Sequence, residues 1–359
     1  MCQLCGRVGL KGTDGEEAPH EALRRGSEPV APIRIKETLR ILADYSNEIV
    51  VLTCSGEMGE LEAIELGLYP VVVLKVPDDS SAADTRRAAS RLAELRVDLI
   101  LFAGGDGTAR DIFDAIDGDL PVLGVPAGVK MHSGVFAINP QEAGRIAIRF
   151  LRGEVSTTQA EVMDVDEEAY RLGRLSAKLY GYMMIPHEAG LVQGIKTGSL
   201  QTTEEIEQQK SVAKHVVEEM QDDTLYILGP GTTVKAITDY LRLEKTLLGV
   251  DVLRNRKMLG IDANERQILE LLDGNSKIIV TPIGGQAYVF GRGNQQISPA
   301  VIRTVGKENI IIVATKNKIF NLPVRRLLVD TGDSLLDSTL RGYVRVVTDY
   351  REETLLRIE

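Results

Sequence analysis

The residues that decide the fold lie in one stretch, Val97-Asp98-Leu99-Ile100-Leu101-Phe102-Ala103-Gly104-Gly105-Asp106-Gly107-Thr108. Its first half is a nearly continuous apolar run, which is typical of a strand buried on both faces of a parallel sheet. Glycines follow at once, and Ile112 and Ile116 then repeat at helical spacing. The order of strand, glycine-rich loop and helix predicts a phosphate-binding edge. Glycines let the backbone approach a phosphate, and a helix N-terminus supplies free N–H groups.

The residues around this stretch alternate between strand and helix patterns. The expected strands are Ile49–Leu52, Val71–Val76 and Pro121–Val125, and the expected helices cover 58–68 and 81–95. Ser81 with Asp84 three residues later resembles a capping box. Such alternation predicts a doubly wound α/β domain with a parallel sheet, which we place at residues 1–153.

The pattern changes after Gly153. Alternating strand-like residues from Glu161 to Ile185 predict a mixed, β-rich second domain, which we place at 154–325. A charged helix is expected at 204–220, and strands are expected at 224–228, 277–282 and 309–315. Residues 326–359 form a C-terminal segment, for which a return to the first domain is one alternative.

Composition excludes several classes of protein. The 359 residues carry a net charge of −10 with a pI near 5.2, which argues against a general nucleic-acid or membrane-surface binder. No apolar run approaches the roughly 18 residues that a membrane helix needs. Three cysteines are too few for a disulfide framework, which indicates the cytoplasm. An anionic ligand must therefore be held locally, by backbone amides and a few cations.

Asp106 is the informative residue of the glycine-rich loop. A carboxylate in a phosphate-binding loop is repelled by its ligand, so it needs a specific role. It would take a proton from an attacking hydroxyl or help to hold Mg²⁺. The alternative is a tight turn in which Asp106 serves only as a local cap.

Five blocks of the sequence resemble the ATP-NAD kinase-like family, also described as ATP-NAD/acetoin-X kinases. The Gly-Gly-Asp-Gly-Thr motif itself is similar to that of NAD kinases, diacylglycerol kinases and sphingosine kinases. The blocks are Gly104–Asp111, Gly124–Ser133, Thr281–Gln286, Gly291–Gln296 and Asp330–Asp333.

The resemblance implies a kinase that transfers phosphate from ATP, or from polyphosphate, to a hydroxyl of NAD to give NADP. It implies Mg²⁺ or another divalent cation with ATP, and a homo-oligomer without nucleic-acid or membrane partners. A kinase for another small or lipid-like acceptor, and a non-catalytic module that senses NAD or ATP, are the alternatives.

By the same resemblance, Asp106 is the base that activates the 2′-hydroxyl of the adenosine ribose. A second loop, Pro126 to Ser133, would face it. In that loop Lys130 would steady the transferring phosphate, unless it is a solvated loop lysine; His132 is expected to be structural. The expected nucleotide- and phosphate-binding residues here are Gly104, Gly105, Gly107, Thr108, Gly128, Lys130 and Ser133.

Other glycine-rich segments add candidates. Gly229-Pro-Gly-Thr-Thr233 resembles the phosphate-binding turns of sugar-phosphate isomerase-like domains, and a plain strand-to-helix turn is the alternative. Its expected phosphate-binding residues are Gly229, Gly231, Thr232 and Thr233. The expected acceptor-binding residues are Gln193, Lys196, Gly284, Gly285, Gln286, Arg292 and Asn294, although a hairpin would also explain the last five. Asp330, Asp333 and Asp337 either bind a cation or form a turn before a helix N-terminus.

Two departures from the family stand out. NAD kinases carry an Asn-Glu/Asp pair that grips the dinucleotide, but the corresponding region here is Ala177–Tyr182, and Asn264-Glu265 is expected on a helix. In relatives a strand and an Asn-Pro loop precede the segment matching Gly6–Gly15. We therefore expect that the chain either lacks the start of the family's first domain or has lost its first strand.

Overall fold

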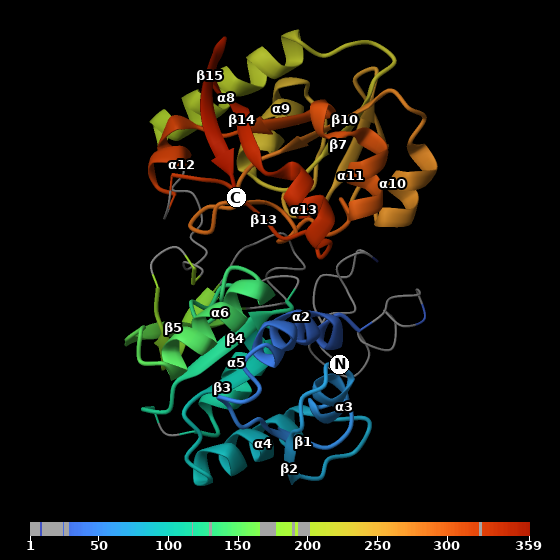
Figure 1. Ribbon diagram of the computed structural model, residues 1–359. Coiled ribbons are helices and arrows are strands. Elements are labelled where there is room, and N and C mark those ends of the chain that lie inside the picture. The colour runs from blue at the N-terminus through green and yellow to red at the C-terminus, as the bar shows by residue number, and fades with distance from the viewer. Residues whose placement is uncertain are drawn as a thin grey trace. The chain divides into compact units, whose positions relative to one another are not determined.

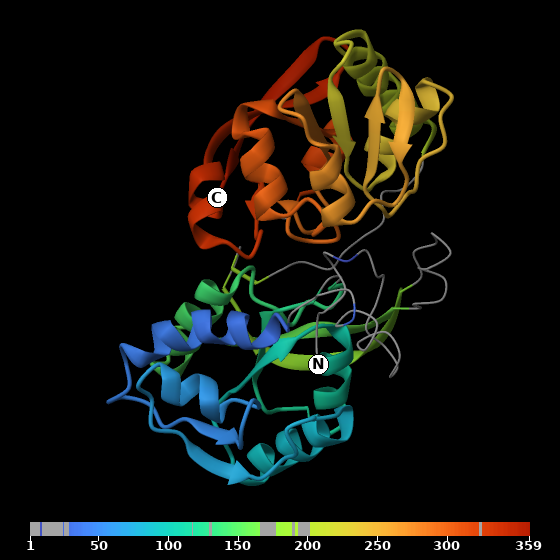
Figure 2. The same cartoon turned by 90° about the vertical axis from the view of Figure 1, so that its right-hand side faces the viewer.

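The computed structural model describes Val8, Arg24 and residues 29–116, 118–128, 131–165, 177–188, 191–192, 202–322 and 325–359. From residue 29 on, these fall into two compact units, unit 1 with residues 29–192 and unit 2 with residues 202–359. Figures 1 and 2 show the elements of each unit.

Unit 1 contains two pairs of parallel strands. Strand β1 (Leu52–Cys54) pairs with β2 (Val71–Leu74), and β3 (Ile100–Gly104) pairs with β4 (Val122–Pro126). The helices are α2 (Ala31–Ala43), α3 (Glu60–Glu65), α4 (Ala82–Glu94), α5 (Asp106–Phe113) and α6 (Pro140–Leu151).

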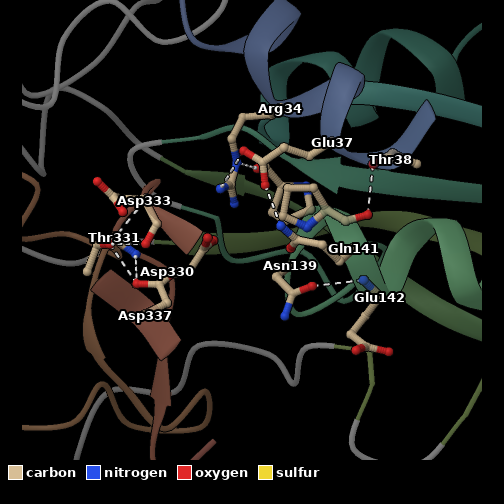
Figure 3. Close-up of polar contacts among 12 residues, drawn as sticks. Arg34, Glu37, Thr38, Asn139, Gln141, Glu142, Asp330, Thr331, Asp333 and Asp337 are labelled. Carbon is tan, nitrogen blue, oxygen red and sulfur yellow. Dashed lines mark hydrogen bonds and ion pairs between the residues drawn. The ribbon is translucent and has the colours of Figure 1, made fainter. Parts of the chain in front are cut away.

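Local sequence explains where these helices begin. At α4, Ser81 N–H donates to Asp84 Oδ2 at 2.9 Å, so the expected capping box is present. At α6, the side chain of Asn139 accepts a hydrogen bond from Glu142 N–H at 2.8 Å (Figure 3), and Pro140 occupies the first turn. Proline suits that position because its missing N–H would have no partner within the helix.

The β3–β4 pair is buried on both faces, as the apolar run predicts. On one face Val122 packs in a cluster with Ala109 and Ile112 of α5. On the other face Leu123 and Val125 pack with α6. Alternate residues of one strand thus face helices on opposite sides, which is the arrangement of a doubly wound sheet.

A long hairpin extends unit 1 beyond the expected boundary at residue 153. Strands β5 (Thr157–Val165) and β6 (Ala177–Pro186) are antiparallel, and Val162 and Met183 join the core cluster that contains Ile112. Gly181 lies so close to Phe113 that a β-carbon would be 2.3 Å from the ring. The hairpin therefore belongs to unit 1, because its apolar face is buried against α5.

Unit 2 is built on a seven-stranded mixed sheet in the order β15-β14-β12-β10-β7-β8-β9. The neighbours β14, β12, β10 and β7 are parallel, and β15, β8 and β9 are antiparallel to their neighbours. The strands are β7 (Leu225–Leu228), β8 (Asp251–Arg254), β9 (Lys257–Gly260), β10 (Ser276–Val280), β12 (Ile310–Val313), β14 (Gly342–Asp349) and β15 (Glu352–Ile358). The segment 326–359 stays in unit 2, because β14 pairs with β12.

Helices cover both faces of this sheet. They are α8 (Thr203–Glu218), α9 (Thr232–Tyr240), α10 (Glu265–Leu271), α11 (Pro299–Val305), the 3-10 helix η1 (Lys307–Asn309), α12 (Lys316–Phe320) and α13 (Ser334–Leu340). Val216 of α8 and Ile237 of α9 pack on Leu228 and Ile279, and α10 and α11 lie on the opposite face (Figures 1 and 2). A separate parallel pair joins β11 (Tyr288–Phe290) and β13 (Leu328–Val329). The expected fold class, a parallel α/β region followed by a mixed sheet, is confirmed.

Within the part of the chain that the structure describes, no helix combines the length and the apolar character needed to cross a membrane.

Candidate active site

The glycine-rich motif forms a tight turn between β3 and α5. Strand β3 ends at Gly104, Gly105 is the N-cap residue, and α5 begins at Asp106. A β-carbon on Gly104 would lie 2.4 Å from Thr108 Oγ1 and 2.6 Å from Thr108 Cβ. Glycine is required here because the first turn of α5 folds back over the end of the strand.

The carboxylate of Asp106 holds the second loop. Asp106 Oδ2 accepts a hydrogen bond from His132 N–H at 2.8 Å, and Oδ1 accepts one from Ser133 N–H at 3.0 Å. His132 Nδ1 lies 3.5 Å from Oδ2. Only 8% of Asp106 is exposed. Asp106 makes no local cap of α5, and each carboxylate oxygen has lone-pair capacity for one more donor.

Strand pairing brings the two loops to one edge of the sheet. Gly104 is in register with Pro126 at the carboxyl ends of β3 and β4. The chain then returns along β4, where Gly124 N–H donates to Val135 O at 2.8 Å. Ser133 Oγ accepts from Met163 N–H of β5 at 2.9 Å. The expected contact between the Gly104–Thr108 motif and the loop from Pro126 to Ser133 is therefore present.

Arg34 supports the second loop from α2 and was not singled out by the sequence. Its Nε donates to Pro126 O at 2.9 Å, and its Nη1 lies 3.9 Å from Glu37 Oε1. Gln141 Nε2 donates to Glu37 Oε2 at 2.6 Å (Figure 3). Arg34 is 5% exposed, so a buried cation lies at the carboxyl end of β4. An arginine among other charged residues of an amphipathic helix gives no signal of this role.

The loop of unit 2 that carries Arg292 and Asn294 is held by its own side chains. Arg292 Nη2 lies 2.6 Å from Asp330 Oδ2, and its guanidinium carbon is 4.8 Å from the centre of the Tyr288 ring. Asn294 Nδ2 donates to Val289 O at 2.8 Å, and its Oδ1 accepts from Gly291 N–H at 3.0 Å. These contacts give both side chains a structural role, and their contact with an acceptor stays a prediction.

The neighbouring residues that are expected to bind the acceptor also lie in closely packed turns. Gly285 has a φ of +77° and Gln286 is buried. A β-carbon on Gly291 would be 1.7 Å from Asp330 O. Gly284 lies in the same turn between β10 and β11. Acceptor binding by Gly284, Gly285 and Gln286 stays a prediction.

Asp333 and Asp337 organise the start of α13. Asp333 Oδ1 accepts from Leu336 N–H at 2.9 Å, as an N-cap does. Asp337 Oδ1 accepts from Thr331 N–H at 3.1 Å and from Thr331 Oγ1 at 2.6 Å (Figure 3). The turn before a helix is thus the arrangement observed. The described residues contain no group of three His, Cys, Asp or Glu side chains that could hold a metal ion.

Several expected residues lie outside the described residues. They are Lys130, Gln193, Lys196 and, apart from Val8, the segment from Gly6 to Gly15. Asn264, by contrast, is described: it is the N-cap of α10, and its Oδ1 accepts from Gln267 N–H at 3.0 Å. The pair Asn264-Glu265 therefore begins a helix, as expected.

Comparison with known families agrees with this arrangement. A model of the ATP-NAD kinase N-terminal domain matches residues 24–155, and a model of the ATP-NAD kinase C-terminal domain matches residues 221–358. The chain belongs to the ATP-NAD kinase family. Membership implies a phosphate-transferring kinase that binds nucleotide. No curated protein and no solved structure matches the chain. In this ATP-NAD kinase family member, β5, β6 and α8 lie between the two matched segments.

Proposed function

We propose that the protein phosphorylates a hydroxyl of NAD to give NADP, with ATP or polyphosphate as the donor. The observation that carries this proposal is the position of Asp106. Its carboxylate lies at the N-terminus of α5, at the carboxyl ends of β3 and β4, and is fixed by the amides of His132 and Ser133. A phosphate group is favoured at such a helix N-terminus, so a phosphate bound there would lie next to a proton acceptor.

In the proposed reaction the acceptor hydroxyl gives its proton to the carboxylate of Asp106. The hydroxyl oxygen forms a new bond to the terminal phosphorus of ATP, and the bond from that phosphorus to the bridging oxygen breaks. ADP leaves with that electron pair. Since phosphate transfer depends mainly on positioning and charge stabilisation, the two amide hydrogen bonds on Asp106 would hold the base in one orientation.

A divalent cation would enter with ATP. Mg²⁺ in kinases is bound by substrate phosphates together with one or two carboxylates, and Asp106 is the carboxylate available in the motif. The cation would neutralise phosphate charge. Phosphate binding by Gly104, Gly105, Gly107, Thr108, Gly128 and Ser133 is part of the same proposal.

A different acceptor is the second candidate, and one observation favours it. The Asn-Glu pair of NAD kinases has no counterpart in Ala177–Tyr182, and Asn264 is engaged as the N-cap of α10. Other residues would therefore bind the dinucleotide, or the acceptor would be another alcohol. Cytoplasmic location and a homo-oligomer remain predictions that follow from composition and family.

Incubation of the purified chain with Mg-ATP, or with polyphosphate, and a panel of alcohols tests the proposal. We expect NADP and ADP in equal amounts by mass spectrometry when NAD is present. Transfer of phosphate to another alcohol but not to NAD would show that this alcohol, and not NAD, is the acceptor. Tight ATP or NAD binding without any transfer would favour the sensing module instead.

A further inference from the structure

A second glycine turn, in unit 2, has the same strand-to-helix geometry as the first. Strand β7 ends at Leu228, Gly231 has a φ of +112°, and α9 begins at Thr232. A β-carbon on Gly231 would lie 2.8 Å from Thr281 Cγ2. Helix α9 has no side-chain N-cap, so its first-turn N–H groups point out of the carboxyl edge of the sheet.

The three parallel strands β7, β10 and β12 end at this same edge. Residues that follow β10 and β12 form a ring of contacts with α8 and with the turn after β7. Hydrogen bonds link the ring from Thr281 to Thr232, and the close approach of Thr281 to Gly231 closes it. Lys318 Nζ donates to Thr281 Oγ1 at 2.9 Å, and Lys318 N–H donates to Thr315 Oγ1 at 3.1 Å. Glu205 of α8 accepts from Thr315 Oγ1 at 3.0 Å. Gln209 Nε2 completes these hydrogen bonds by donating to Glu205 Oε1 at 3.0 Å and to Thr232 Oγ1 at 3.2 Å.

The ammonium group of Lys318 is incompletely satisfied in this ring. An ammonium has three N–H donors, and among the described residues the Thr281 hydroxyl is its one hydrogen-bond partner. No carboxylate of those residues lies within 4.0 Å of Lys318 Nζ, although Glu205 attracts it from farther away. Lys318 is 9% exposed. A buried cation with a neutral partner is costly unless an anion pairs with it.

A second polar group points to the same place. Thr233, in the first turn of α9, is fully buried, and its Oγ1 has no hydrogen-bond partner among the described residues. Helix side chains lean toward the helix N-terminus, so this hydroxyl leans toward the turn that holds Gly231. A donor or acceptor left unpaired in the interior costs free energy that a ligand would recover.

We propose that this edge of unit 2 is a binding site for a phosphate monoester. The phosphate would receive hydrogen bonds from the first-turn amides of α9, the Thr233 hydroxyl and the Lys318 ammonium. Ligands of parallel α/β sheets bind outside the carboxyl ends of the strands, which is where these groups meet. Its groups all belong to unit 2, whereas Asp106 and its loops belong to unit 1. Helix α8, which supplies Glu205 and Gln209, lies outside both matched family segments.

The protonation state of Lys318 fits an anion site. Burial lowers the pKa of Lys318 to about 8, and the negative charge of Glu205 opposes that shift. At neutral pH the ammonium is therefore still charged. Affinity for a phosphate monoester should fall as the pH rises above about 8, because the cation is then lost.

Calorimetric titration of the full chain with glycerol 3-phosphate, inorganic phosphate and glycerol tests the site. We expect binding of the two phosphates and none of glycerol. Lys318→Met should weaken phosphate binding by about 10- to 100-fold, the range for a hydrogen bond to a charged group. Lys316→Met is the matched control in the same helix, because Lys316 is exposed and pairs with Glu352. It should bind phosphate like the unmodified chain.

Two further variants separate this site from unit 1 and from misfolding. Thr233→Val removes a hydroxyl that has no partner within the described protein, so it should leave the melting temperature unchanged while it weakens phosphate binding. Asp106→Asn should keep the binding. The proposal is overturned if Lys318→Met, still folded by circular dichroism, binds glycerol 3-phosphate as tightly as the unmodified chain. Equal binding of glycerol and its phosphate would also overturn it.

Discussion

Gly105 and Gly128 bring two loops into backbone contact: a β-carbon on Gly128 would lie 3.2 Å from the Cα of Gly105. The same β-carbon would be 2.5 Å from Met131 Cγ. Gly128 therefore has no room for a side chain, and the hydrogen bonds from the second loop to Asp106 depend on this approach. The glycines thus do more than leave space for a phosphate, because they also set the distance between the loops.

Gly128→Ala should lower turnover by about tenfold, since an added methyl group must push Met131 and the second loop away from Asp106. Steady-state kinetics with Mg-ATP measures the effect. Gly118→Ala is the control, because no atom lies within 4 Å of a β-carbon there. Equal turnover in both variants would show that the loop spacing does not matter for the reaction.

Asp106→Asn should reduce turnover by about 10²-fold or more, because the carboxamide cannot take a proton from the acceptor. ATP binding should change little. Asp114→Asn changes an exposed carboxylate at the opposite end of the same helix, one that accepts from Tyr180 Oη, and should remain active. Single-turnover kinetics together with ATP titration separates chemistry from binding. Near-normal turnover of a folded Asp106→Asn chain removes the assigned role.

Arg34→Met should destabilise the chain by about 1.5–3 kcal/mol, the range for a hydrogen bond to a charged group. The lost bond leaves Pro126 O without the Arg34 donor and loosens the second loop. Turnover should fall as well, with a smaller change in the KM for ATP. Arg40→Met, on an exposed position of α2, is the control in urea unfolding and kinetics. Unfolding curves that coincide for the two variants contradict the role of Arg34.

Lys245→Met should destabilise unit 2 by about 3–5 kcal/mol, as removal of one partner from a buried ion pair does. Lys245 Nζ lies 3.0 Å from Asp251 Oδ2, and both side chains are fully buried. Lys257→Met in the exposed part of β9 should change the free energy of unfolding by less than about 0.5 kcal/mol. Thermal and urea unfolding compare the two. If Lys245→Met lost less free energy of unfolding than Lys257→Met, apolar packing could replace the Lys245–Asp251 ion pair.

Lys318 should make the free energy of unfolding depend on pH. Its pKa is about 8 in the folded chain and about 10.4 in an unfolded one. Between these values the unfolded state binds more protons, so stability rises with pH and the penalty of the buried cation disappears. Relative to Lys318→Met, the unmodified chain should gain about 3 kcal/mol between pH 7 and pH 10.5. Urea unfolding of both proteins across this range, without phosphate, measures the difference in their free energies of unfolding. A difference that does not change with pH contradicts a lowered pKa for Lys318.

Much of the fold could be predicted because local patterns were strong. The apolar run before Gly104 and the helical spacing of Ile112 gave β3 and α5 within three residues of their bounds. The approach of the second loop to Asp106 was predicted from the resemblance to the kinase family, and it agrees with the shared carboxyl edge of β3 and β4. The acidic residues of 330–337 stayed ambiguous, because a carboxylate that caps a helix and one that binds a cation look alike in sequence.

Long-range packing could not be predicted in the same way. The strand alternation of β5 and β6 was visible, but nothing local told which core their apolar face would join; contact with Phe113 decides it. Arg34 and Lys318 resemble ordinary charged helix residues, and only burial distinguishes them. Glu205 and Thr315 are 110 residues apart in the chain, so the ring in unit 2 has no sequence signal.

The strand order of unit 2 leaves two edges, β9 and β15, and both are poor templates for adding another strand. Strand β9 is four residues long and begins with an exposed lysine, Lys257, which limits the ladder that a second chain could form. At the other edge Leu327 N–H donates to Arg357 O at 2.8 Å and Glu359 N–H donates to Leu327 O at 3.0 Å, so the end of β15 is already paired. Addition of another strand is therefore limited along β9 and blocked at the C-terminal end of β15. Such edges favour a sheet that stays at seven strands over one that grows by pairing with a second chain.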